Sequence, residues 1–271
     1  MSPSDFRGRV AIVTGGATGI GHATARRLAQ GGATVFVGDR SSHLEESVAE
    51  LRQEGLDVHG RRADVRSAGD LQALAGWAVE VAGGVDALCC CAGIQTYGTA
   101  VDTSEETWDQ TLDVNVKGMF LAAKHTIPAL RRRGGGAIVL VASVQGIACQ
   151  TGVVAYAASK GAILAMTRAI ALDHAREGIR CNAVCPGSVD TPMLRGAADL
   201  FRGERTQDEL VAEWGLSHPM GRVARPDEVA EVIAFLAGER SSFVTGSQYV
   251  VDGGLLAGVA VALPHGEEGS R

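Results

Sequence analysis

Tyr156 and Lys160 stand at positions i and i+4 of an alanine-rich stretch that is typical of a helix. Side chains at this spacing lie on one face of a helix. A phenol has a pKa of about 10 and is a poor base near neutral pH, but a neighbouring ammonium stabilises the phenolate. The pair therefore indicates an acid–base site, although tyrosine and lysine also occur at this spacing on ordinary helix surfaces.

A glycine-rich turn, Thr-Gly-Gly-Ala-Thr-Gly-Ile-Gly over residues 14–21, follows the first apolar strand and precedes a helix expected over 22–30. Small residues at such a turn let the backbone approach a pyrophosphate, whose charge meets the amides of the helix N-terminus. The alternative is a tight strand-to-helix turn without a ligand. In this position the pattern predicts a dinucleotide site.

Asp39 ends the second strand, close to the interval of about 20 residues at which an acidic residue binds the adenosine ribose. Its carboxylate would repel a 2'-phosphate, which predicts NAD rather than NADP. The adjacent Arg40 would instead accommodate that phosphate, and Asp39 could also be an ordinary turn carboxylate.

The bulk composition predicts one large domain. The chain has 271 residues, 46% hydrophobic and 21% charged, and its 36 glycines are spread among apolar residues rather than gathered in low-complexity tracts. We expect a single domain over 1–271, with a polar, irregular substrate lid at about 188–225.

Charge and cysteine usage limit the partners and the compartment. A net charge of -6 gives no general reason to bind nucleic acid or an anionic membrane. The polar residues at positions 2–7 do not resemble a signal peptide, and no apolar run would span a bilayer. The six cysteines lack the spacing of a zinc or redox motif, so we expect them to be reduced and mostly buried, in a soluble cytoplasmic protein without a metal site.

Strands and helices alternate along the chain. β-branched and apolar runs predict about seven strands, at 10–13, 34–37, 58–63, 87–91, 137–141, 180–184 and 248–251. Ser67-x-x-Asp70 and Thr103-x-x-Glu106 are predicted capping boxes, and Pro226 is predicted to open a further helix. This order predicts an α/β fold, a Rossmann-type doubly wound sheet of parallel strands with helices on both faces.

With these elements in place, nearly the whole chain resembles the short-chain dehydrogenase/reductase family. Its glycine turn has that family's Thr-Gly-x-x-x-Gly-x-Gly form. Further motifs match in the family's order, namely Asp64-Val65, Ala92-Gly93, Asn115, Ser143, Tyr156 with Lys160, and Pro186-Gly187.

The resemblance implies roles for four catalytic residues. Tyr156 would be the general base in alcohol oxidation and the acid in carbonyl reduction. Lys160 would bind the nicotinamide ribose and lower the tyrosine pKa, and Ser143 would donate a hydrogen bond to the substrate oxygen. The backbone of Asn115 would seat a water in a proton relay.

The resemblance also implies the cofactor contacts, which are Gly15, Thr18, Gly19, Ile20, Gly21, Asp39, Arg40, Asp64, Val65, Cys91, Ala92, Gly93, Tyr156, Lys160, Pro186, Gly187, Val189 and Thr191. One departure stands out. Where the family usually has Asn-Asn-Ala-Gly, this chain has Cys90-Cys91-Ala92-Gly93. Thiols bond weakly, so we expect backbone contacts to survive while side-chain bonds that brace the sheet are lost.

The substrate contacts implied by the resemblance are Ser143, Gln145, Gln150, Tyr156, Met193 and Arg195. The two glutamines could bond hydroxyls of a sugar, cyclitol or hydroxy acid. Arg195 could pair with a carboxylate if the lid folds inward, although an exposed lid arginine is the simpler expectation.

These features predict an NAD-dependent oxidoreductase acting on a small secondary alcohol or its ketone. Two alternatives are a dehydratase or epimerase that returns the cofactor unchanged, and a dinucleotide-sensing protein without catalysis. The helices expected over 103–131 and 153–177 are long and partly apolar, and by the resemblance they predict a homotetramer.

Overall fold

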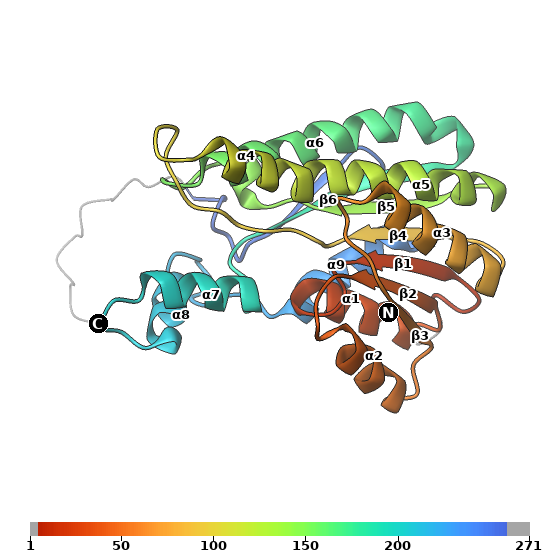
Figure 1. Cartoon of the computed structure of the whole chain (residues 1–271), viewed down its shortest axis with the longest axis horizontal. Coiled ribbons are helices and arrows are strands. Elements are labelled where there is room, and N and C mark those ends of the chain that lie inside the picture. Colours follow the sequence, from red (N-terminus) through yellow and green to blue (C-terminus); the bar gives the residue numbers. More distant parts are fainter. Residues whose placement is uncertain (1–4, 259–271) are drawn as a thin grey trace, which may run out of the picture.

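A computed structural model describes residues 5–258. Seven parallel strands form one sheet (Figure 1), in the order β3-β2-β1-β4-β5-β6-β7. They are β1 (Val10–Thr14), β2 (Thr34–Asp39), β3 (Val58–Arg62), β4 (Ala87–Cys90), β5 (Gly136–Val141), β6 (Ile179–Pro186) and β7 (Gln248–Val251). The predicted doubly wound sheet is confirmed, and each predicted strand matches an observed one to within two residues at either end.

Nine α-helices are present among the described residues: α1 (Gly19–Gln30), α2 (Leu44–Gln53), α3 (Ala68–Ala82), α4 (Glu105–Leu112), α5 (Gly118–Arg132), α6 (Val154–His174), α7 (Pro192–Phe201), α8 (Gln207–Gly215) and α9 (Pro226–Ala237). A π-helical turn, Asp113–Lys117, joins α4 to α5. Helix α1 begins at Gly19 rather than at His22, so part of the glycine turn already belongs to the helix.

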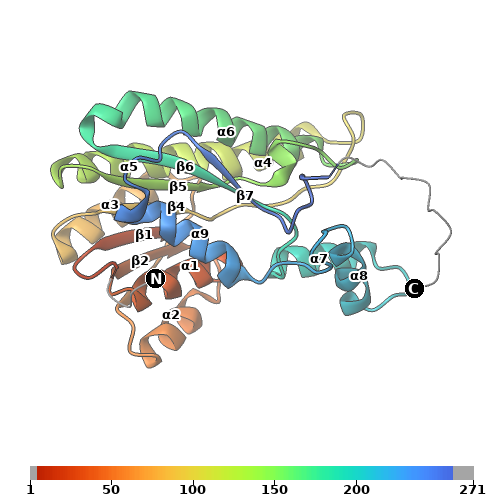
Figure 2. The ribbon, with the colours of Figure 1, turned by 180° about the vertical axis from the view of Figure 1, so that it is seen from behind.

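The helices cover both faces of the sheet. One face packs against α3, α5 and α6, and the other against α1, α2 and α9 (Figures 1 and 2). Successive strand residues point to opposite faces. Thus Ile12 of β1 contributes to the core under α3 and α5, whereas Val13 contributes to the core under α1 and α9. Both cores are apolar, which is why the inner strands β1, β4 and β5 are hydrophobic without alternation, whereas the edge strand β3 carries exposed arginines.

Helix starts follow local capping chemistry. The Ser67 hydroxyl accepts a hydrogen bond from the Asp70 amide at 3.2 Å, as predicted. The prediction for Thr103 is wrong by one residue, because Ser104 is the N-cap of α4 and accepts from the Thr107 amide. The Thr103 hydroxyl instead donates to the carbonyl oxygen of Thr99, so the preceding turn takes it away from the helix.

The predicted lid region contains α7 and α8, which lie beside the main body (Figure 1). Leu210 and Val211 of α8 pack against Ala198 of α7, with Trp214 at the edge of this small cluster. The lid therefore has an apolar contact surface of its own, separate from the two faces of the sheet.

No helix within residues 5–258 is long and apolar enough to cross a bilayer. The same residues contain no cluster of three or more histidines, cysteines or carboxylates that could bind a metal. The predicted absence of a signal peptide rests partly on residues 2–4, which lie outside the described residues, as do the ends of the domain predicted over 1–271.

Candidate active site

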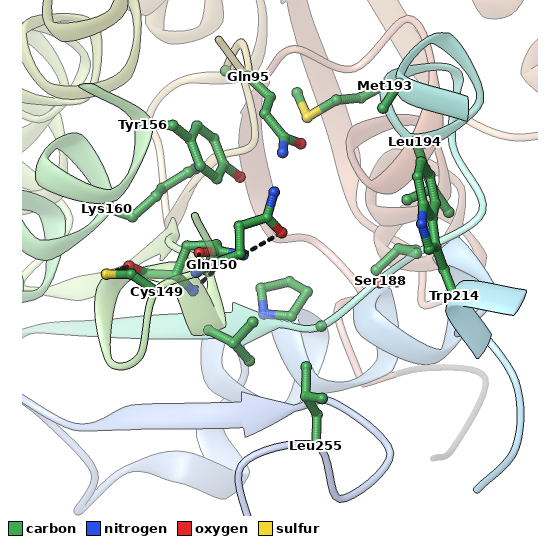
Figure 3. A pocket seen from close by; sticks show the side chains of 18 of the residues that line it. Gln95, Cys149, Gln150, Tyr156, Lys160, Ser188, Met193, Leu194, Trp214 and Leu255 are labelled. Carbon is green, nitrogen blue, oxygen red and sulfur yellow. Dashed lines mark hydrogen bonds between the residues drawn. The ribbon is translucent and has the colours of Figure 1, made fainter. Parts of the chain in front are cut away.

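Two connected cavities lie at the carboxyl ends of the strands, where ligands bind in open α/β sheets. The larger, of about 910 Å³, contains Ser143 in its wall, together with Tyr156 and Lys160, which Figure 3 shows side by side. The smaller, of about 240 Å³, is lined by the glycine turn and Asp39. They share wall residues, among them Ile20 and Gly93. The structure thus brings the acid–base pair and the glycine turn to adjoining space.

Tyr156 lies near the start of α6 and is only 7% exposed. Burial raises its pKa to about 12, and a hydrogen bond with Ser143 acts in the opposite direction. The expected lowering of this pKa by Lys160 is not seen in the chain alone. The reason is desolvation, which disfavours the phenolate more strongly than its polar neighbours favour it.

Lys160 follows one helical turn later and is 5% exposed. Its Nζ donates to the carbonyl oxygen of Val141 at 3.0 Å and lies 5.3 Å from the centroid of the Tyr156 ring. Burial lowers the Lys160 pKa to about 8, while the nearby thiols of Cys185 and Cys91 raise it slightly. The ammonium is therefore partly deprotonated just above neutral pH.

Ser143 lies two residues after β5 and caps a short 3-10 turn, Val144–Gly146. Its Oγ accepts from the Gln145 amide at 3.1 Å. A hydroxyl that accepts one backbone bond still has its own proton to donate. Ser143 is thereby fixed with a donor close to the Tyr156 hydroxyl.

Asn115 lies in the π-helical turn and is fully buried. Its side-chain Oδ1 accepts from the Ile94 amide, and its Nδ2 donates to the Ile94 carbonyl and to Ser159 Oγ. Ser159 Oγ in turn donates to the Tyr156 carbonyl oxygen. The side chain of Asn115 therefore braces the start of α6 and does not line either cavity.

In the glycine turn, neighbouring backbone atoms leave no room for a side chain at Gly15 or at Gly21. Gly15 has φ +71°, and a Cβ on it would lie 2.5 Å from the backbone of Ala92. A Cβ on Gly21 would lie 1.9 Å from the carbonyl oxygen of Gly15. The turn therefore requires glycine at these positions. Its amides and the start of α1 form a cradle of the kind that a dinucleotide pyrophosphate fits.

Asp39 and Asp64 line the smaller cavity. Asp39 accepts bonds from the amides of Ala17 and Ser41, at 2.9 and 2.8 Å, so its carboxylate is fixed against the glycine turn. The Arg66 guanidinium hydrogen-bonded to Asp64 lowers the pKa of that carboxyl to about 2. Asp64 is thus anionic at neutral pH, and both carboxylates have acceptor capacity left over.

All the predicted cofactor contacts line one cavity or the other. In the smaller cavity lie Gly15, Thr18, Gly19, Ile20, Gly21, Asp39, Arg40, Asp64, Val65, Cys91, Ala92, Gly93 and Thr191, and in the larger Tyr156, Lys160, Pro186, Gly187 and Val189. The residues present fit a nicotinamide dinucleotide, with an anion cradle at one end and a buried hydroxyl–amine pair at the other.

The cysteines in place of the usual asparagines are accommodated by hydroxyl neighbours. Cys90 is fully buried and hydrogen-bonds Thr14, and Cys91 hydrogen-bonds Thr24. Burial raises the pKa of the Cys91 thiol to about 12, so it is protonated and unreactive. All six cysteines are free, and only Cys149 is classed as exposed.

The predicted substrate residues divide into two groups. Gln145, Gln150 and Met193 line the larger cavity with Ser143 and Tyr156. The structure does not bring Arg195 there. Its guanidinium donates to Asp190 at 2.6 and 2.8 Å and to Asp208 at 2.8 Å, and these carboxylates raise its pKa. Both partners belong to the lid region, so Arg195 braces the lid.

Sequence reasoning missed several wall residues, namely Gln95, Tyr97, Phe201, Trp214 and His218. Tyr97 and Phe201 meet edge to face at 4.7 Å between ring centroids, which joins α7 of the lid to the loop after β4. His218 is 3% exposed and its Nδ1 contacts the Asp252 carbonyl oxygen at 2.6 Å. Only the closeness of Gln95 and Tyr97 to Gly93 could have suggested two of them, because Phe201, Trp214 and His218 come from segments far away in the sequence.

Comparison with known proteins agrees with this geometry. A family model described as enoyl-(acyl carrier protein) reductase matches residues 15–256. Human dehydrogenase/reductase SDR family member 4 is 37% identical over 248 residues, which cover 91% of this chain and 87% of the relative. The chain belongs to the short-chain dehydrogenase/reductase family. Members of this oxidoreductase family use nicotinamide dinucleotide cofactors.

Other members of the short-chain dehydrogenase/reductase family show a range of activities. Cis-4-hydroxycyclohexanecarboxylate dehydrogenase of Sinomonas cyclohexanicum is 38% identical, over 93% of this chain and 98% of its own. Ligand-free aldohexose dehydrogenase of Thermoplasma acidophilum has a TM-score of 0.90 at 35% identity, over 97% of this chain and 100% of its own. A variant actinorhodin polyketide ketoreductase with NADPH has a TM-score of 0.87 at 37% identity, over 94% and 99%.

Proposed function

We propose that this protein interconverts a small secondary alcohol and its ketone, with NAD preferred over NADP and Tyr156 as the general acid–base. One observation supports this most strongly. Tyr156, Ser143 and Lys160 line a single cavity that adjoins the glycine cradle. An acid–base group beside a dinucleotide site suits hydride transfer with proton transfer.

The dinucleotide would supply or accept the hydride when bound. Gly15, Gly19 and the start of α1 would bind its pyrophosphate through backbone amides. Asp39 would accept bonds from the adenosine ribose, and Lys160 would bind the nicotinamide ribose. These roles use groups that the chain already places around the two cavities.

Tyr156 is protonated at neutral pH, because its pKa is raised to about 12. In ketone reduction it would donate this proton to the substrate oxygen while Ser143 donates a second hydrogen bond. Two donors aimed at one oxygen stabilise negative charge as it develops there. In the protein without cofactor, Tyr156 is therefore in the protonated form that a general acid needs.

Alcohol oxidation needs the reverse, a deprotonated Tyr156. The bond from Ser143 favours the phenolate, and the positive charge of an oxidised nicotinamide would favour it further. Lys160 carries a full charge only below its pKa of about 8, so its help weakens at alkaline pH. Since the Asn115 side chain is occupied by Ile94 and Ser159, its backbone would serve the proton relay.

The preference for NAD rests on Asp39. A fixed carboxylate at the glycine turn would repel a 2'-phosphate and attract ribose hydroxyls. Arg40 also lines this cavity, and one structural neighbour is a ketoreductase with NADPH, so activity with both cofactors must be compared directly.

The decisive experiment is Tyr156→Phe. Turnover of a secondary alcohol or ketone, followed by NADH absorbance across a panel of sugars, cyclitols and hydroxy acids, should fall by at least about 100-fold, while NADH binding persists. Tyr249→Phe is the matched control, because Tyr249 lies on β7 against Phe235 and outside both cavities. Normal turnover by Tyr156→Phe would exclude the mechanism.

We further propose a cytoplasmic homotetramer. The six free cysteines suit a reducing compartment. Exposed apolar side chains on α5 and α6, Phe120 at 50% and Leu172 at 81%, support association through these helices. Light scattering on the purified protein would test the assembly, and a monomeric mass would exclude it.

A further inference from the structure

The turn after β5 carries two glutamines that bond to each other on the wall of the larger cavity (Figure 3). Gln145 Nε2 donates to Gln150 Oε1 at 2.9 Å, and Gln145 Oε1 accepts from the backbone amide of Gln150 at 2.9 Å. Gln145 therefore uses one of its two N–H donors and one of its two acceptor positions on Gln150, which fixes the two side chains against each other.

Hydrogen-bond chemistry determines the orientation of both amides. The backbone N–H of Gln150 can only donate, so the Gln145 atom facing it must be the oxygen. That leaves the Gln145 NH2 group to face Gln150, and an NH2 group needs an acceptor. Gln150 must then present Oε1 to Gln145, and its own NH2 group faces away.

The NH2 group of Gln150 is thus the part offered to the cavity. It makes no hydrogen bond to residues 5–258, and Figure 3 shows it directed toward Tyr156 and Gln95. Its two N–H bonds are donors without acceptor capacity. Gln150 is exposed, so water can satisfy these donors in the free protein, and a ligand that replaces this water would present an oxygen acceptor near Tyr156.

The charge of the wall favours a neutral acceptor. Among the described residues the larger cavity contains no arginine, its lysine is the buried Lys160, and Asp102 adds a negative charge. Arg195, the first arginine of the lid region, is hydrogen-bonded to Asp190 and Asp208. A carboxylate bound beside Gln150 would therefore meet no arginine or lysine partner on this turn, and the carboxylate of Asp102 would repel it.

We infer that Gln150 donates to an uncharged carbonyl oxygen of the substrate and that Gln145 is the residue that positions it. The substrate class is a ketone or secondary alcohol with a second, neutral carbonyl group, such as an ester, a lactone or another ketone. This inference rests on the proposed oxidoreductase function and makes it more specific.

Gln145→Glu tests the orientation directly. A carboxylate at this position still accepts from the Gln150 amide, but it cannot donate to Gln150 Oε1. The Gln150 side chain then turns its NH2 group toward the new carboxylate and its oxygen toward the cavity. Preference should shift from a carbonyl substituent to one with a donor hydroxyl.

One cyclohexanone skeleton with a methyl ester, a free carboxylate, a hydroxymethyl or a methyl group at position 4 provides the probes. We expect wild type to favour the ester over the methyl compound by about tenfold in kcat/KM. Gln145→Glu and Gln150→Met should each remove this ratio, and only Gln145→Glu should favour the hydroxymethyl compound over the ester. Ile147→Gln, on the same turn but outside the cavity wall, should keep the wild-type ratio.

Binding of the same compounds to NADH-saturated Tyr156→Phe protein, by calorimetry, gives a readout without turnover. An ester preference in binding but no turnover by wild type would leave the inference standing and refute the proposed function. Equal binding of ester and methyl compounds, an unchanged ratio in Gln145→Glu, or stronger binding of the free acid than of the ester would overturn the inference.

Discussion

Replacing Gly15 by alanine should disrupt the glycine turn for two separable reasons. Gly15 has φ +71°, and an L-residue in this left-handed region costs about 1–2 kcal/mol. The new Cβ would also lie 2.5 Å from the Cα and N of Ala92, which are backbone atoms that cannot rotate away. Such overpacking costs about 1–3 kcal/mol, so the total loss is about 2–5 kcal/mol.

Gly55→Ala separates the two contributions. Gly55 has φ +79°, nearly the same conformation, and nothing lies within 4 Å of the position its Cβ would take. It should therefore lose only the conformational part, about 1–2 kcal/mol. The two variants should therefore differ in free energy of unfolding by about 1–3 kcal/mol, which measures the clash between the turn after β1 and the backbone after β4.

Urea denaturation at one protein concentration gives the free energy of unfolding, and fluorescence titration with NADH gives cofactor affinity. Gly15→Ala should lose both stability and NADH affinity, because the backbone shift moves the amides of the cradle. Gly55→Ala should bind NADH as wild type does. Equal destabilisation of the two variants with unchanged NADH binding would refute this account of the turn.

Three further predictions concern the site and its surroundings. Ser143→Ala should lower kcat about 100-fold. In the wild-type protein the hydrogen bond from Ser143 lowers the pKa of Tyr156, so its loss should move the alkaline rise in the rate of alcohol oxidation to higher pH, and an unshifted pH profile would contradict this role. Asp39→Asn should raise the ratio of NADP to NAD efficiency at least about tenfold, and an unchanged ratio would remove Asp39 from cofactor selection. The free energy of unfolding should fall above about pH 9, because unfolded thiols ionise there while buried thiols such as Cys181, with a pKa near 12, stay protonated. Lys160, whose pKa is lowered to about 8, makes the opposite contribution between about pH 8 and 10.5, so the urea midpoint of Lys160→Met should fall more steeply with pH than that of wild type. Equal slopes in the two proteins would contradict the Lys160 assignment, and a midpoint of Lys160→Met that does not change with pH would contradict the thiol assignment.

Much of the fold and of the site's membership was predictable because it depends on local patterns. Apolar strands buried on both faces are identifiable from composition, and the carboxyl ends of parallel strands lie on one edge of the sheet. The glycine turn after β1 and Pro186-Gly187 after β6 therefore had to line adjoining space. Errors at the ends of elements were of one to three residues, as at Thr103, whose hydroxyl bonds to the preceding turn and not to the helix.

The sequence by itself determined the order of elements, the cofactor cradle and the spacing of Tyr156 and Lys160, because each follows from neighbours along the chain. Only the tertiary structure decided what surrounds these groups. Burial of Tyr156 under several elements raises the pKa that spacing alone suggested would fall. The partners of Arg195 and the mutual bonds of Gln145 and Gln150 depend on which groups meet across turns, and a hydrogen bond, unlike a helix period, leaves no repeat in the sequence.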